Sequence, residues 1–220
     1  MKIIRKVIIT MIALGLVAVG CGTAGAAPIT ITLSHFSSDL TPAGVLDARF
    51  VFSTIGNYLN LLVYNDTADP DAYKINQIYF NATGNVTGLE LVPDFFPPGW
   101  TLLNDEAAGG FGVFDFYLDG GNGNDSNLIP PGEFESFGFA ISGTGPPFPE
   151  TDFVSFSTIP PGDTVALAAA KFIGGPADND PDEEDEDSAF GAAVPIPGAV
   201  WLLGSGLVGL VAIRRKRSVK

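Results

Sequence analysis

An alternation of apolar and polar side chains, sustained from residue 27 to about residue 172, constrains the fold of this chain most. Runs such as ITITLSHF (29–36) and FGVFDFYLDGG (111–121) put every second side chain on the same face. A period of two is the spacing of a β-strand that buries one face. Segments rich in Gly, Pro, Asn and Asp, for instance PDFFPPGW and TGPPFPE, separate the runs. We therefore expect short strands joined by many turns.

The pattern predicts an all-β domain over residues 27–174, with about seven to nine strands in an antiparallel β-sandwich. A jelly roll is a variant that the same pattern allows. The segment DTVALAAAKF (163–172) has an Asp in an N-cap position and could form a helix, but a final strand is favoured. The other expected strands lie in residues 29–36, 50–66 (two runs broken at 55–57), 73–84, 85–92, 111–121, 135–142 and 153–158.

Charge is distributed very unevenly along the chain. All 25 acidic residues lie between Asp39 and Asp187, and eight of the 11 Lys and Arg residues lie in the first six or last seven positions. Such an acidic body repels nucleic-acid phosphate, so we expect no nucleic acid among the partners. Residues 175–192, in which eight of the ten residues from Asp178 to Asp187 are acidic, are expected to form an acidic, disordered linker. The linker would hold the folded domain away from an anionic membrane, and weak calcium binding is its alternative role.

The N-terminus has the parts of a secretory signal peptide, which we expect to span residues 1–26 as a helix. Three basic residues precede VIITMIALGLVAV, an apolar run of the length of a signal core. Ala24 and Ala26 place small side chains at positions −3 and −1, which predicts cleavage by signal peptidase before Ala27. Two alternatives stay open: an uncleaved anchor, or acylation of Cys21, the only cysteine, as in a lipoprotein.

Side chains suited to catalysis are scarce. After the predicted cleavage the chain holds one histidine, His35, and no cysteine. A Ser-His-Asp triad would have to use His35, which lies in an alternating run with no nucleophile motif nearby. A zinc site needs more His or Cys residues, and acidic residues are too abundant to single out a glycosidase pair. We therefore expect that the protein is not an enzyme.

The segment LDGGNGNDSNL (118–128) combines oxygen ligands with a glycine-rich turn. Calcium prefers such carboxylate and amide oxygens. The candidate ligands are Asp119, Asn122, Asn124 and Asp125. The segment occurs once, without the stacked copies of a calcium-binding β-helix or the closing Glu of an EF-hand. A flexible hairpin loop is the simpler interpretation, calcium is the alternative, and no other cofactor is expected.

Exposed aromatic side chains could bind glycans, because flat rings stack on the apolar faces of sugars. Most phenylalanines are expected in the core. Trp100, within PPGW, is the aromatic residue that the sequence favours for a surface position and a glycan contact. Asn-X-Ser/Thr patterns also start at Asn65, Asn81, Asn85 and Asn124, although these residue types are common in the turns of any secreted β protein.

Residues 193–220 consist of three parts in a fixed order. VPIP has prolines at alternate positions, which forbids a helix and keeps the chain extended. GAVWLLGSGLVGLVAI (198–213) is a candidate transmembrane helix, about 24 Å long and therefore marginal for a bilayer. The tail 214–220 is basic and stays cytoplasmic under the positive-inside rule. The residues of the motif are Val194, Pro195, Ile196 and Pro197, and the basic residues that follow the span are Arg214, Arg215, Lys216 and Arg217.

This order, together with the sequence AVWLLGSGL, resembles the PEP-CTERM protein-sorting signal in its VPLP-type variant. Ile196 stands where that variant usually has Leu. The resemblance implies a Gram-negative bacterium and an exosortase, a membrane-embedded cysteine protease, that recognises VPIP and cleaves near it. It also implies passage from the inner membrane to the cell surface or an exopolysaccharide matrix. An ordinary single-pass membrane anchor is the alternative.

The sequence thus predicts an exported, non-catalytic surface or extracellular-matrix protein that an exosortase sorts and cleaves. A carbohydrate- or exopolysaccharide-binding module is the rival from another functional class. Binding to polysaccharide would distinguish the two.

Overall fold

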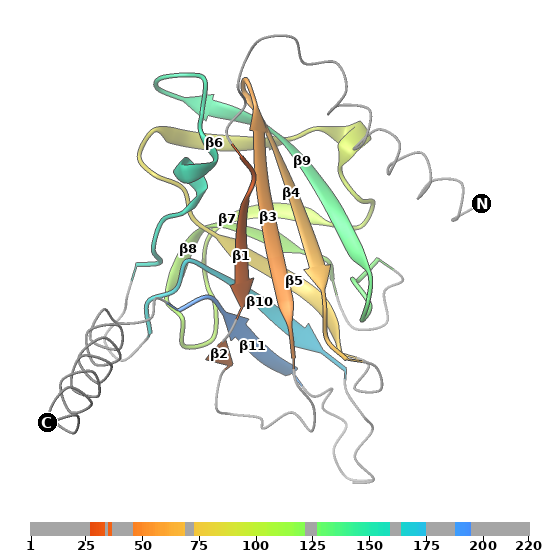
Figure 1. Cartoon of the computed structure of the whole chain (residues 1–220). Coiled ribbons are helices and arrows are strands. Elements are labelled where there is room, and N and C mark those ends of the chain that lie inside the picture. Colours follow the sequence, from red (N-terminus) through yellow and green to blue (C-terminus); the bar gives the residue numbers. More distant parts are fainter. Residues whose placement is uncertain are drawn as a thin grey trace, which may run out of the picture.

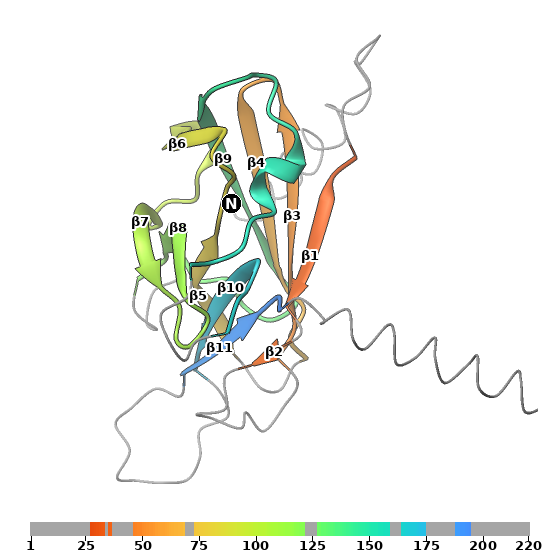
Figure 2. The ribbon, with the colours of Figure 1, turned by 90° about the vertical axis from the view of Figure 1, so that its left-hand side faces the viewer.

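Two stacked antiparallel sheets make up the described part of the protein in a computed structural model, and they are seen from two sides in Figures 1 and 2. The structure describes residues 27–33, 35–36, 46–68, 73–121, 127–158, 164–174 and 188–194. The predicted all-β, sandwich-like fold is confirmed. No helix in this part of the chain is long and apolar enough to cross a membrane, and the predicted signal helix and the span 198–213 lie outside it.

The sheet in front in Figure 1, called sheet A, has five strands. In spatial order they are β1 (Ile29–Leu33), β3 (Ala48–Ile55), β4 (Tyr58–Asn65), β9 (Phe134–Gly143) and β6 (Val86–Leu91). The second sheet, sheet B, has six strands. In order they are β2 (His35–Phe36), β11 (Ser188–Ala192), β10 (Ala168–Ile173), β5 (Lys74–Phe80), β8 (Val113–Asp119) and β7 (Thr101–Ala107).

Most connections between strands pass from one sheet to the other. Only the pairs β3–β4, β7–β8 and β10–β11 are hairpins of consecutive strands within one sheet, among the described elements. The β3–β4 hairpin turns at Gly56, whose φ of 63° is the left-handed conformation that glycine adopts without strain. The crossing connections pair strands that are distant in sequence: sheet A is complete only with β9, and sheet B only with β11.

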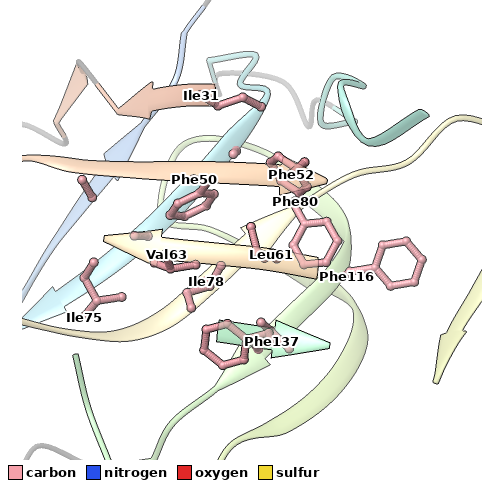
Figure 3. Packing of buried hydrophobic residues seen from close by; sticks show 14 of the residues in the cluster. Ile31, Phe50, Phe52, Leu61, Val63, Ile75, Ile78, Phe80, Phe116 and Phe137 are labelled. Atoms are coloured by element: carbon pink, nitrogen blue, oxygen red, sulfur yellow. The ribbon is translucent and has the colours of Figure 1, made fainter. Parts of the chain in front are cut away.

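Aromatic side chains fill the space between the sheets (Figure 3). Phe50 and Phe52 alternate inward along β3, as the period-two pattern predicts, and both are fully buried. Phe80 of sheet B meets Phe52 edge-on at 5.7 Å between ring centroids and Phe139 of sheet A at 6.2 Å. Burying each such ring stabilises the fold by about 1.5–3 kcal/mol, so this layer is the main source of stability.

A second cluster lies on sheet B and is built around two tyrosines. Tyr79 of β5 lies opposite Tyr117 of β8, with ring centroids 4.8 Å apart, while their neighbours Ile78 and Phe80 belong to the core between the sheets. Strand alternation therefore turns the tyrosine pair away from sheet A. Burial raises the pKa of both Tyr79 and Tyr117 far above the usual value of a tyrosine.

Residues 153–158, expected to form a strand, do not form one. The 3₁₀ turn η2 (Glu150–Phe153) occupies the first of these positions, and only Thr158 makes an isolated bridge, to Val113. Phe153 is fully buried and stacks on Phe52 at 6.1 Å, while Glu150 Oε1 accepts the Thr54 N–H at 3.0 Å. The segment thus closes the core beside β3 instead of extending a sheet.

The expectation for residues 175–192 is wrong at its C-terminal end. Ser188–Ala192 form β11, which pairs with β10 on one side and β2 on the other. Small residues in SAFGA allow this: Ala189 and Ala192 are almost fully buried. Residues 175–187 lie outside the described residues, but they join β10 to β11. The acidic stretch is therefore an insertion in a hairpin of the domain and not a spacer between the domain and the C-terminal segment.

The segment that could have been either a helix or a strand is a strand. β10 (Ala168–Ile173) lies between β5 and β11, which confirms the preference for a strand over a helix here. The predicted strand runs in 29–36, 50–66, 73–84, 85–92, 111–121 and 135–142 each contain described strands.

Candidate functional site

Only one predicted calcium ligand lies in the described residues. Asp119 ends β8, and its Oδ1 accepts the N–H of Gly121 at 3.0 Å, a turn that starts the following loop. Asn122, Asn124 and Asp125 lie outside the described residues, so calcium binding there stays a prediction. Within the described part, no three His, Cys, Asp or Glu side chains come together as metal ligands.

Trp100 is a core residue, and its predicted surface position is wrong. Its side chain is 4 % exposed, and Nε1 donates a hydrogen bond to the Asn127 carbonyl at 2.9 Å. The indole meets Phe137 edge-to-face, with 5.0 Å between centroids. A Cβ atom at Gly120 would lie 2.8 Å from the indole, so glycine is needed there for this packing. Trp100 therefore cannot present its ring to a glycan while the domain is folded.

In two of the Asn-X-Ser/Thr patterns, burial of the asparagine side chain excludes glycosylation. Asn65 is fully buried, and its Nδ2 donates to the carbonyls of Tyr73 and Ile129 at 2.7 and 2.9 Å. Asn81 is 2 % exposed, and its Oδ1 accepts the Asp115 N–H at 2.8 Å. These amides hold loops in place and are inaccessible to a modifying enzyme. Asn85 is exposed.

Along the chain, the two predicted processing sites directly flank the folded domain. Ala27 is exposed and stands two residues before β1, whereas Ala24 and Ala26 are outside the described residues. At the other end, Val194 follows β11 by two residues and packs against the second cluster. Pro195, Ile196 and Pro197, the span and the basic residues 214–217 lie beyond the described part. The folded domain thus occupies almost the whole interval between the two sites.

An aromatic surface on sheet A was not foreseen. The outward positions of β4 are Tyr58, Asn60, Leu62 and Tyr64, which alternate with the core residues of that strand. Strand register places Tyr64 next to Phe134 of β9, with ring centroids 5.1 Å apart. We call this surface, formed by Tyr58, Asn60, Tyr64, Phe95, Phe134 and Ser136, the aromatic face.

Arg49 borders one end of the aromatic face. Its guanidinium carbon lies 3.6 Å from the centroid of the Tyr64 ring, and Nε donates to Asp66 Oδ2 at 2.6 Å. The hydrogen bond to Asp66 raises the pKa of Arg49 above its ordinary value, so the guanidinium is charged at any working pH. The charged guanidinium, held over the ring by Asp66, fixes the orientation of Tyr64 by a cation–π contact.

A polar pair occupies the middle of the aromatic face. Ser136 Oγ donates to Asn60 Oδ1 at 2.8 Å, and neither side chain is fully buried. Among the described residues, the Asn60 amide nitrogen makes no hydrogen bond, so its two donors are available to a ligand. Aromatic rings on both sides with hydrogen-bonding groups between them suit a ligand that has apolar faces and hydroxyl edges.

The two most exposed rings are Tyr58, at the other end of the aromatic face, and Phe95, beside Gly138, which pairs with Asn60. Tyr58 is 60 % exposed, and Phe95, in the 3₁₀ turn η1 (Pro93–Phe95), is 59 % exposed. Phe95 reaches β9 because Gly138 lacks a side chain: a Cβ there would lie 2.6 Å from the Phe95 Cβ. From Tyr58 to Tyr64 the face extends about 20 Å along β4, six strand residues.

The aromatic face was missed because β4 is apolar on both sides. In YLNLLVYN the inward residues are Leu59, Leu61 and Val63, but Leu62 and the two tyrosines face outward. The available signal was that both faces of this strand carry large apolar or aromatic residues, which is unusual for a strand with one solvated face.

Comparison with known proteins assigns no family, because no protein-family model, curated protein or solved structure matches this chain. The functional argument therefore rests on the two ends of the domain and on the aromatic face.

Proposed function

We propose that this chain is an exported, non-catalytic protein of the cell surface or extracellular matrix, delivered there by its C-terminal sorting signal. The order of VPIP, apolar span and basic tail in the sequence is the basis of the proposal. The observation that carries it furthest is that the last strand, β11, ends at Ala192, two residues before the motif begins. A cut near the motif would release a domain that keeps every strand of the described residues.

The proposed route has two cleavages. Signal peptidase removes residues 1–26, and the span 198–213 then holds the precursor in the inner membrane with the basic tail in the cytoplasm. An exosortase thiol attacks the carbonyl carbon of a peptide bond near VPIP. The domain becomes the acyl group, the C-terminal fragment leaves as an amine that takes the thiol proton, and water or an amine on the surface then accepts the acyl group.

Substitution of the motif prolines tests this route. In the native host, a chain with Pro195→Ala and Pro197→Ala should stay in the inner membrane at precursor length, while the unaltered chain reaches the surface or medium in shortened form. Phe156→Ala, at a side chain 55 % exposed on the domain, serves as a control that should be processed normally. Equal release of all three chains would contradict the sorting role.

A second candidate function, polysaccharide binding, is favoured by the aromatic face. Its exposed rings and the free amide donors of Asn60 offer both kinds of contact that a sugar chain uses. Asp94, Glu133 and Glu135 are chain neighbours of the exposed rings Phe95 and Phe134, while Arg49, which stacks on Tyr64, is already paired with Asp66. This charge pattern suits a neutral polysaccharide better than a strongly anionic one.

Binding to the host's exopolysaccharide tests the second candidate. Tyr58→Ala, Phe95→Ala and Phe134→Ala should each weaken binding about tenfold, as expected for exposed aromatic anchors. Phe156→Ala removes an equally exposed ring outside the aromatic face and should leave binding unchanged. If all four variants bind alike, the aromatic face is not the binding surface.

A further inference from the structure

The predicted sorting motif begins inside the folded domain. β11 pairs along its whole length with β10, from Ser188 opposite Ile173 to Ala192 opposite Ala169. The pairing then continues one residue further: the Leu167 N–H donates to the Ala193 carbonyl, and the Ala193 N–H donates to the Ala168 carbonyl, both at 2.9 Å. The first residue without such bonds is therefore Val194, the first residue of VPIP.

Side chains at this end are also held in the fold. Ala192 is fully buried, and Ala193 is 5 % exposed and belongs to the core between the sheets. Val194 is half-buried against the second cluster, which contains Tyr79 and Phe114. Proline has no N–H to continue the pairing, so the prolines at positions 195 and 197 explain why the strand stops here.

A protease that cuts near VPIP needs this same backbone. Proteases commonly bind substrates as an extended strand, through main-chain hydrogen bonds on both sides of the scissile bond. The main-chain groups of Ala193 are already bonded to Leu167 and Ala168, and Val194 is packed against the second cluster. The segment cannot pair with the sheet and bind to the protease at the same time.

We infer that the sorting motif is latched to the sandwich, so that the C-terminal end of β11 must open locally before the protease can cleave near VPIP. The inference rests on the proposed sorting function and adds a regulatory step to it. Residues 195–197 connect the latched Val194 to the proposed span. Three residues reach at most about 10 Å. The precursor domain therefore sits directly on the membrane, and the local stability of the β10–β11 end sets the rate of cleavage.

Two full-length variants change the latch in opposite directions. Insertion of six Gly and Ser residues between Ala193 and Val194 leaves β11 intact and frees the motif, so cleavage should be about tenfold faster. Ala169→Cys combined with Ala192→Cys joins facing residues of the two strands by a disulfide and should slow cleavage by a similar factor. Ala169→Cys alone is the matched control, since the predicted mature chain has no other cysteine.

Cleavage is followed by pulse-chase labelling in the native host, with and without dithiothreitol. We expect the doubly substituted chain to accumulate as precursor and to be cleaved at the normal rate after reduction, which also shows that it is folded and recognised. If the oxidised double variant and the insertion variant are both cleaved at the rate of the unaltered chain, the latch is refuted while the sorting function stands. If the unaltered chain is never shortened, the sorting function fails and the latch fails with it.

Discussion

Shortening the acidic segment should stabilise the sandwich, because this segment closes the β10–β11 hairpin. Ile173 pairs with Ser188, so the loop between them has 14 residues. Keeping Gly174, whose φ of 82° suits the turn out of β10, and replacing residues 175–187 by three residues leaves a four-residue loop. The loop-closure entropy falls with the logarithm of loop length, which gives a gain of about 1 kcal/mol in the free energy of unfolding.

Charge adds to this gain. The replaced segment carries eight acidic residues, whose mutual repulsion is released when the chain unfolds and expands. The stabilisation should therefore exceed 1 kcal/mol at low ionic strength and approach it at high salt. A variant of unchanged length, with the eight acids replaced by Asn and Ser, isolates the electrostatic part.

Thermal unfolding of the full-length protein in detergent, followed by circular dichroism, measures the effect. For a domain of this size, 1 kcal/mol corresponds to a rise of about 2–4 °C in Tm. A true spacer outside the domain would leave Tm unchanged, and an unchanged or lower Tm in the shortened variant would refute the hairpin assignment. The loop closes the hairpin at Ser188, whereas the latch opens at the opposite end of β11, beyond Ala192. Shortening should therefore leave C-terminal processing unaffected, in contrast to a spacer that gives a protease access.

Three further predictions concern single side chains. Trp100→Ala should destabilise the fold by about 3–5 kcal/mol in urea titrations, because it empties a core site, whereas a surface role would predict almost no change. Because burial raises the pKa of Tyr79, the folded state keeps a proton that the unfolded chain loses, so stability should fall as pH rises above about 10; the urea midpoint of Tyr79→Phe should fall less. Millimolar calcium should raise Tm if the loop 118–128 binds it, and Asp125→Ala should abolish the rise; no shift in the unaltered protein excludes that site.

Strand alternation predicted sheet A well. The run 50–66 predicted two strands and a turn at 55–57, and the structure has β3, Gly56 with positive φ, and β4 in those places. This prediction succeeded because Phe50, Phe52, Leu59 and Leu61 alternate with residues that face outward, so local pattern and tertiary packing agree.

Strands without alternation were missed. β7 has the sequence TLLNDEA and lies at the edge of sheet B, where most of its side chains are exposed and no apolar face is required. β11 consists of small residues that follow an acidic run, so its burial between β10 and β2 leaves little trace in the sequence. Both strands are defined by their neighbours and not by their own pattern.

The candidate sites could not be predicted from the local sequence pattern either. The burial of Trp100 depends on the absence of a side chain at Gly120 and on an acceptor at Asn127, neither of which is close to it in sequence. The aromatic face depends on the register that pairs Tyr64 with Phe134, residues separated by 69 intervening positions. Contacts of this kind follow from topology, which the sequence pattern alone left open.

Mass spectrometry of the mature protein from its native host tests the central claim most directly. The account predicts an N-terminus at Ala27 and a C-terminus at or close to VPIP, with the span 198–213 and the basic tail absent. The mass at the C-terminus would also reveal any group attached there. A mature chain that still contains the span 198–213 and the basic tail would contradict the sorting function and would leave the C-terminal segment as a permanent anchor.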